Sequence, residues 1–218
     1  MSRILLILVT LLISSNVQAN TVNLNYVSPN TVVATQVSVN HHRLRTYIGS
    51  YNLQVSDIAE TIVGFCVDPF QWANKTPTIY DRSALDASDF FSGNGVSRLI
   101  NAQKLYDNAY AGLSSNEQTA GFHLALWEIF HDDLNTSTGI IRATNGSNAG
   151  MLSIANTFLA ELNGWRTKNL YDLTFYKSNR YQDFLVATEK PATVPLPAAL
   201  PLLASGLLGF STMRRRKT

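Results

Sequence analysis

The chain has 218 residues, of which 45% are hydrophobic, and carries a formal net charge of +2. That length allows one domain of ordinary size with flanking segments and a real core. Five of the 17 basic residues lie in the two terminal segments described next, which leaves 12 basic against 15 acidic residues between them. A mildly acidic domain lacks the basic surface that nucleic-acid binding requires, so no nucleic-acid partner is expected.

The first 19 residues have the layout of a secretory signal peptide. A single basic residue, Arg3, precedes an apolar run over residues 4–13, and small residues end at Ala19. This pattern predicts export through the Sec translocon and cleavage after Ala19 by signal peptidase. The apolar run is shorter than the roughly 20 residues of a membrane span, so an uncleaved anchor is the less favoured alternative.

The other end of the chain has the layout of a membrane-sorting tail. After a polar linker at residues 188–194 come a proline motif, an apolar stretch over residues 199–213 and a basic cluster. The motif is Val194, Pro195, Leu196, Pro197 and Ala198, and the basic cluster is Arg214, Arg215, Arg216 and Lys217. Basic residues stay on the cytoplasmic side, so one transmembrane helix would hold the domain across the inner membrane.

This tail resembles the C-terminal sorting signal of PEP-CTERM proteins in its VPLPA variant. The resemblance implies a bacterium that has an outer membrane and makes exopolysaccharide, and an exosortase-type enzyme that cuts at the proline motif. The product would then reach the cell surface or the extracellular matrix, with exopolysaccharide as a candidate partner. A tail that is never processed is the alternative, and it would make the protein a membrane-resident sensor domain.

The segment over residues 114–132 organises the rest of the domain. Its apolar residues go almost all the way round a helix, which predicts a helix buried on every side. About eleven apolar-rich residues are too few to span a bilayer, which favours a position in a protein core. Ser114 and Glu117 match a capping box, in which the two side chains satisfy free backbone amides, and this predicts a helix start near Ser115.

Further helices and strands flank this central helix. Hydrophobic periodicity predicts helices over residues 96–110 and 149–162 and strands over 31–39, 44–51, 61–67, 79–80, 170–176 and 181–187. Gly49 inside the second strand predicts a bend or bulge. Strands, then three helices, then strands predict an α+β domain over residues 20–187, with the strands in a barrel or a sandwich.

Cys66 is the only cysteine, so no intrachain disulfide can form. Residues 64–68 around it and residues 125–128 of the central helix, Ala-Leu-Trp-Glu, together resemble the thioester-domain family of bacterial surface adhesins. In that family a strand cysteine is bonded to the side-chain carbonyl of a glutamine in a Q-x-A-x-W helix motif, and the thioester captures amines on a target surface. Here His123 occupies the glutamine position. An imidazole has no acyl carbon, so no thioester is expected.

Two reactive alternatives involve other partners for Cys66. Gln118 is the nearest glutamine, but five helical positions correspond to about 140° of rotation and 7.5 Å of rise, so it should face elsewhere. His123 could instead act as a base for the Cys66 thiol, with Asp68 or Glu128 as the orienting carboxylate. A buried, unreactive cysteine beside a core histidine is the favoured interpretation.

The end of the central helix carries several candidate metal ligands. The candidates are Glu128, His131, Asp132 and Asp133, with His41 and His42 as the only additional nitrogen donors. A site needs three or four convergent ligands, so a solvated helix end is expected, with no metal and no cofactor. The sequence thus predicts a noncatalytic binding or structural protein of the cell surface or matrix, and a covalent adhesin or cysteine-dependent enzyme as the alternative.

Overall fold

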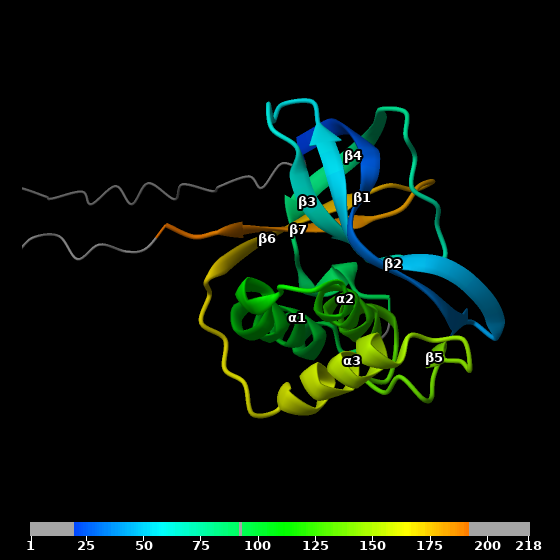
Figure 1. Ribbon diagram of the computed structural model, residues 1–218. Coiled ribbons are helices and arrows are strands. Elements are labelled where there is room, and N and C mark those ends of the chain that lie inside the picture. Colours follow the sequence, from blue (N-terminus) through cyan, green and yellow to red (C-terminus); the bar gives the residue numbers. More distant parts are fainter. Residues whose placement is uncertain (1–19, 92, 192–218) are drawn as a thin grey trace, which may run out of the picture.

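The computed structural model describes residues 20–91 and 93–191, which form one α+β domain. The expected signal peptide with its cleavage site at Ala19, the VPLPA motif at 194–198 and the basic cluster at 214–217 lie outside the described residues. The three α-helices gather on one side of the strands (Figure 1). Among the described residues no helix is both long and apolar enough to cross a membrane.

The strands pair in a closed circuit. They are β1 (Asn20–Val39), β2 (His42–Val55), β3 (Ile62–Cys66), β4 (Thr78–Ala84), β5 (Ile141–Ala143), β6 (Tyr171–Lys177) and β7 (Phe184–Glu189). Their order is β2-β3-β7-β6-β4-β1-β5, every printed pair is antiparallel, and β1 pairs with β2 as well. This circuit has the pairing pattern of a barrel rather than of two stacked sheets. Strand β7 includes Thr188 and Glu189, which the sequence analysis assigned to the linker.

The long hairpin of β1 and β2 contains a sharp irregularity at Gly49. Asn40 and His41 form its two-residue turn with φ angles of 48° and 67°, as the right-handed twist of a hairpin requires. Gly49 has φ +149°, and a Cβ atom there would lie 2.0 Å from the carbonyl oxygen of Thr31. The register of the hairpin shifts opposite this position, between Pro29 and Val32. The predicted bend at Gly49 is therefore confirmed.

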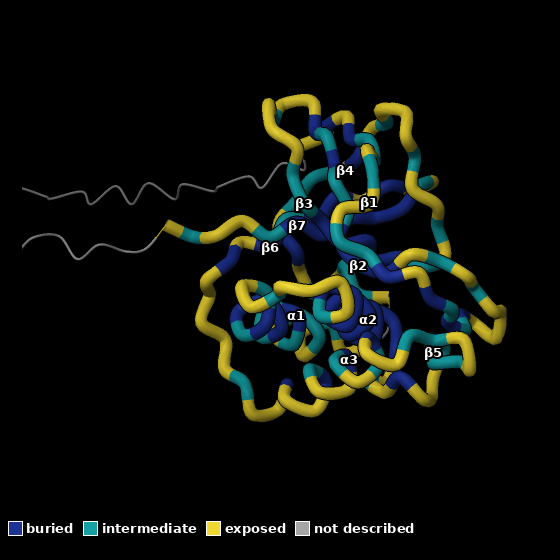
Figure 2. The backbone as a smooth tube through the Cα atoms, viewed as in Figure 1, coloured by how far each residue is buried: buried dark blue, intermediate teal, exposed yellow. Residues whose placement is uncertain are grey.

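The central helix is buried as predicted. The helices are α1 (Gly95–Ala109), α2 (Asn116–His131) and α3 (Ala149–Glu161), and every residue of α2 from Thr119 to His131 is buried (Figure 2). The predicted cap is wrong by one residue, because Ser115 and not Ser114 accepts from the Gln118 backbone N–H. The hydroxyl of Ser114 instead donates to the Gln118 side chain.

Helix α2 separates two apolar clusters. Leu124 and Trp127 pack in the cluster with the barrel strands, whereas Phe122 and Leu126 pack in the cluster with α1 and the sheet. Close approach of α3 depends on Gly121, where a Cβ atom would lie 2.7 Å from the Ile154 side chain. The helix thus connects the strands to the other two helices, which explains why it is apolar on all sides.

Helix α1 departs from its predicted faces. Helical periodicity over residues 96–110 predicts Val96 and Ile100 on the buried apolar side and Asp107 on the outer side. In the structure Val96 and Ile100 are exposed, and Asp107 is buried. The Asp107 carboxylate accepts hydrogen bonds from three successive backbone N–H groups, those of Lys168, Asn169 and Leu170. These donors precede β6 and would otherwise lack partners, which is the physical reason for burying the acid.

Candidate functional site

Cys66 and His123 meet between the barrel and α2. Cys66 is the last residue of β3, is buried, and has a free thiol. Its Sγ lies 3.2 Å from Nε2 of His123, which comes 57 residues later in the chain. The expected contact between the Cys66 thiol and the His123 imidazole is therefore confirmed.

The two ring nitrogens of His123 have distinct roles that fix its proton. Nδ1 accepts a 2.8 Å hydrogen bond from the backbone N–H of Gly49, and Nε2 lies 2.6 Å from the carbonyl oxygen of Cys66. A backbone N–H can only donate and a carbonyl can only accept. Nδ1 is therefore unprotonated, and Nε2–H faces both the carbonyl and the sulfur of Cys66.

Burial keeps both groups uncharged. Removal from water lowers the pKa of His123 to about 4, although its hydrogen bond to the Cys66 carbonyl opposes the shift. Burial likewise raises the pKa of the Cys66 thiol, an effect that the Trp127 side chain partly offsets. Near neutral pH the site consists of a neutral thiol beside a neutral imidazole, and the nitrogen that faces the sulfur already carries its proton.

The other residues proposed for this chemistry lie elsewhere. Asp68 accepts from the Phe70 backbone N–H, and Glu128 accepts from the Asn135 backbone N–H, so neither orients His123. Gln118 lies in the first turn of α2, where its side-chain oxygen accepts from the backbone N–H and the hydroxyl of Ser114. Gln118 therefore faces elsewhere, as its position on the helix predicted. Neither Asp68 nor Glu128 orients His123, because the two ring nitrogens face Gly49 and Cys66 instead.

Three ring N–H groups attach α2 to the end of β3. Trp127 Nε1–H donates to the Cys66 carbonyl at 3.0 Å, which also accepts from His123. His131 Nε2 lies 2.5 Å from the carbonyl oxygen of Val67, and that contact again requires a protonated Nε2. His123, Trp127 and His131 are spaced four residues apart, so they lie on one face of the helix. This spacing is a signal that the sequence analysis did not use.

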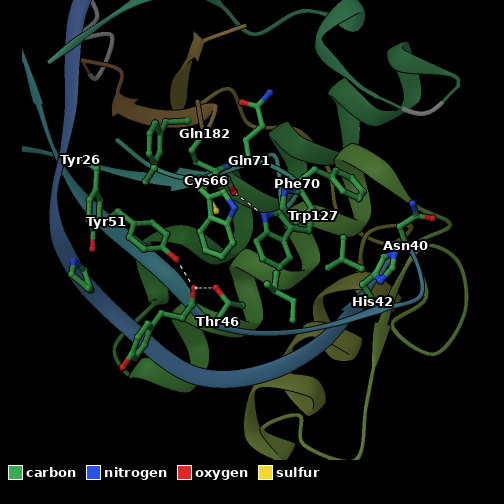
Figure 3. Close-up of a pocket in the computed structure, with 18 of the residues that line it drawn as sticks. Tyr26, Asn40, His42, Thr46, Tyr51, Cys66, Phe70, Gln71, Trp127 and Gln182 are labelled. Carbon is green, nitrogen blue, oxygen red and sulfur yellow. Dashed lines mark hydrogen bonds between the residues drawn. The ribbon is translucent and has the colours of Figure 1, made fainter. Parts of the chain in front are cut away.

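A pocket opens above Cys66. Its volume is about 470 Å³, and Tyr51 and Trp127 lie on either side of Cys66 at its base (Figure 3). Tyr47, Phe70 and Trp72 also line it and are exposed, Trp72 to 75%. These aromatic side chains could not be grouped from the sequence, because they come from β2 and from the loop after β3 and meet only in the fold.

Polar groups share the pocket with the aromatic rings. Asn40, His42, Gln71 and Gln182 all contribute to its lining. The Gln182 amide N–H group donates to the carbonyl oxygen of Asp68 at 2.6 Å, which fixes that side chain. The pocket can therefore contact both an apolar face and hydrogen-bonding groups of one ligand.

The fold is similar to that of a known surface-protein domain. The N-terminal thioester domain of a surface protein from Clostridium perfringens matches with a TM-score of 0.50 and 11% sequence identity, over 78% of this chain and 100% of that chain. No protein-family model and no curated protein matches the sequence. The chain therefore has a thioester-domain-like fold, as the motifs around Cys66 and Trp127 indicated. The resemblance of the tail to PEP-CTERM signals stays a prediction.

Proposed function

We propose that the protein is an exported, noncatalytic binding protein of the cell surface or the exopolysaccharide matrix. The signal peptide would direct it through the Sec translocon, the tail would hold it in the inner membrane, and an exosortase-type enzyme would release it at residues 194–198. The signal-peptide and tail patterns support this route. The thioester-domain-like fold supports the destination, since the similar solved domain belongs to a surface protein.

The proposed lack of covalent chemistry at Cys66 is supported by the protonated Nε2 of His123, which lies 3.2 Å from the sulfur. An imidazole supplies no acyl carbon for a thioester. A neutral, buried thiol is also a poor nucleophile, because the thiolate is the reactive form. With His123 at the glutamine position we expect no covalent reaction, so the domain would bind its ligand without a covalent bond.

The pocket above Cys66 is the proposed binding site. Its volume of about 470 Å³ is in the usual range for small-ligand pockets. A sugar unit suits its lining, because a pyranose ring presents an apolar face to aromatic rings such as Trp72 and hydroxyl groups to amides such as Gln71 and Gln182. Exopolysaccharide of the producing cell is therefore the proposed ligand.

The intact mass of the protein recovered outside the cell tests the route and the chemistry together. A chain that ends between Val194 and Ala198, with the mass calculated from its remaining residues, supports release without a thioester. A mass lower by one ammonia would show that a thioester exists, and a retained tail would favour a membrane-resident domain. Cys66 should react with iodoacetamide only after denaturation, and fast labelling of the native protein would contradict the unreactive thiol.

Cosedimentation with the secreted polysaccharide tests the binding site. Trp72→Ala should reduce the bound fraction, because it removes the most exposed ring that lines the pocket. Ile79→Ala is the matched control, since Ile79 is also an exposed apolar residue but lies on β4 outside the pocket. Equal binding by the two variants would exclude the pocket as the polysaccharide site.

A further inference from the structure

Three carboxylates converge where α2 ends. Glu128 lies in the last turn of the helix, Asp132 is its C-cap, and Asp133 follows. One oxygen from each of the three lies within 4.8 Å of the others. Two oxygens that bind the same calcium ion at 2.3–2.6 Å can be at most about 5.2 Å apart. The three acids are thus close enough to share one ion.

Glu128 has an oxygen without a partner. Its side chain is fully buried, Oε2 accepts from the Asn135 backbone N–H at 3.1 Å, and Oε1 has no hydrogen bond within the described part of the chain. The same Asn135 N–H also donates to Asp133 Oδ1 at 3.1 Å, so one backbone donor holds the two carboxylates close together, and Asp133 Oδ2 accepts from the Thr138 hydroxyl. A buried oxygen without a partner costs free energy, which an ion could offset.

No basic side chain of the described residues pairs with these acids. The ion pairs found there are Arg82–Asp57 and Lys190–Asp172. Arg98 is close, but its guanidinium donates to the backbone carbonyls of Glu128, Ile129 and Asp132. Arg98 therefore brings one positive charge near the cluster, but no basic side chain of the described residues forms an ion pair with the three carboxylates.

The loop after α2 holds the acids in place and leaves one side open. A Cβ atom at Gly139, whose φ is +72°, would lie 1.8 Å from Asp132 Oδ1, so the loop closes tightly over this carboxylate. Asp132 Oδ2 accepts from the Ile141 backbone N–H at 2.5 Å. Asp133 is exposed, so water can supply the further oxygens that a bound ion needs.

We propose that Glu128, Asp132 and Asp133 bind one calcium ion. The set consists of oxygen ligands only, because His131 directs Nε2 to the Val67 carbonyl, and such a set suits calcium rather than zinc. Burial of two of the acids contradicts the solvated helix end expected from the sequence. Three carboxylates with several waters suggest a dissociation constant of about 10⁻⁴ to 10⁻³ M, as in extracellular calcium modules.

Thermal unfolding of the exported protein tests this site. After removal of metals with a chelator, calcium chloride at about ten times the dissociation constant should raise the unfolding midpoint by about 3–6 °C. Asp133→Asn should abolish the rise and still fold, because Asp133 is exposed. Glu161→Gln, on the surface of α3, should leave the rise unchanged.

Two results would overturn the proposal. One is an unchanged midpoint for the wild-type protein up to about 10 mM calcium, ten times the upper expected dissociation constant. The other is an equal calcium effect in Asp133→Asn, which would place the ion elsewhere. Glu128→Gln gives a second readout, because it should lose the calcium response and yet stay about as stable as wild type in chelator, since glutamine keeps the size of the side chain and an oxygen that can accept from the Asn135 backbone N–H.

Discussion

The backbone N–H of Gly49 donates a 2.8 Å hydrogen bond to Nδ1 of His123, and this contact fixes the tautomer of the buried, neutral imidazole. It leaves Nε2 as the protonated nitrogen, 3.2 Å from the sulfur of Cys66. A strand irregularity in β2 thereby sets the chemistry of a thiol at the end of β3.

Stability should fall in acid because His123 is buried uncharged. Its folded pKa of about 4 lies below the unfolded value near 6.5, so its contribution is complete above pH 6.5 and is lost as the pH falls towards 4. The free energy of unfolding should drop by about 3 kcal/mol between pH 7 and pH 4 from this residue. Urea unfolding as a function of pH measures it.

A matched pair of variants isolates the histidine. Cys66→Ala removes the thiol next to the ring, and Cys66→Ala/His123→Gln also removes the imidazole. The difference between the two variants in the pH dependence of the free energy of unfolding therefore comes from His123. Tyr51 also faces the ring, but burial raises its pKa further, so it stays neutral throughout. Parallel pH profiles for the two variants would show that His123 is not the buried group that titrates.

His123→Gln should restore the capacity to form a thioester. The glutamine would place its acyl carbon beside the Cys66 sulfur, and its amide can keep both contacts of the imidazole, accepting from Gly49 and donating to the Cys66 carbonyl. We expect part of the purified variant to be lighter by one ammonia. Cys66→Ala/His123→Gln is the control and should keep its full mass. A full mass for both variants would mean that a glutamine beside Cys66 is not sufficient for thioester formation in this site.

Gly49→Ala should destabilise the protein strongly. The added Cβ would lie 2.0 Å from the Thr31 carbonyl oxygen, and φ +149° is strained for any residue with a side chain. We expect a loss of at least about 2 kcal/mol in the free energy of unfolding. Gly112→Ala is the comparison, because nothing lies within 4 Å of the Cβ position there. Similar losses for both glycines would argue against the close contact.

Trp127→Phe should weaken the attachment of α2 to β3. The variant keeps an aromatic ring but loses the 3.0 Å hydrogen bond to the Cys66 carbonyl, at a cost of about 1–2 kcal/mol. Trp165→Phe tests the same exchange at a half-buried tryptophan that packs on Phe158. Chemical denaturation should show a larger loss in the free energy of unfolding for Trp127→Phe than for Trp165→Phe. The reverse order would show that the Trp127 hydrogen bond does not stabilise the domain.

The sequence allowed those parts of the fold to be predicted whose signal is local. Helix α2 was predictable because its apolar residues surround it, and the bend at Gly49 because an isolated glycine in a strand favours one. Strand β5 was missed because three residues carry too little periodicity. The closed circuit of strands could not be deduced from the sequence. Strand β1 pairs with its neighbour β2 in a hairpin, but it also pairs with β4 and β5, which lie far away in the chain and leave no local signal.

The site was half predictable for a similar reason. The motifs around Cys66 and Trp127 placed the thiol next to His123, but the state of the imidazole depends on Gly49, which lies 74 residues away in the chain. The surface position expected for Asp107 was wrong because its three backbone donors lie about 60 residues further on. Hydrogen-bond partners of buried polar groups are set by tertiary contacts that no local pattern encodes.

The position of β7 at the centre of the sheet also constrains when the domain can fold. This strand, Phe184–Glu189, is the last of the domain, and it pairs with β3 on one side and β6 on the other. A chain that crosses a membrane from its N-terminus cannot complete the barrel until residue 189 has emerged. Under the proposed export route, the domain would thus stay unfolded, and fit for translocation, until residue 189 has crossed.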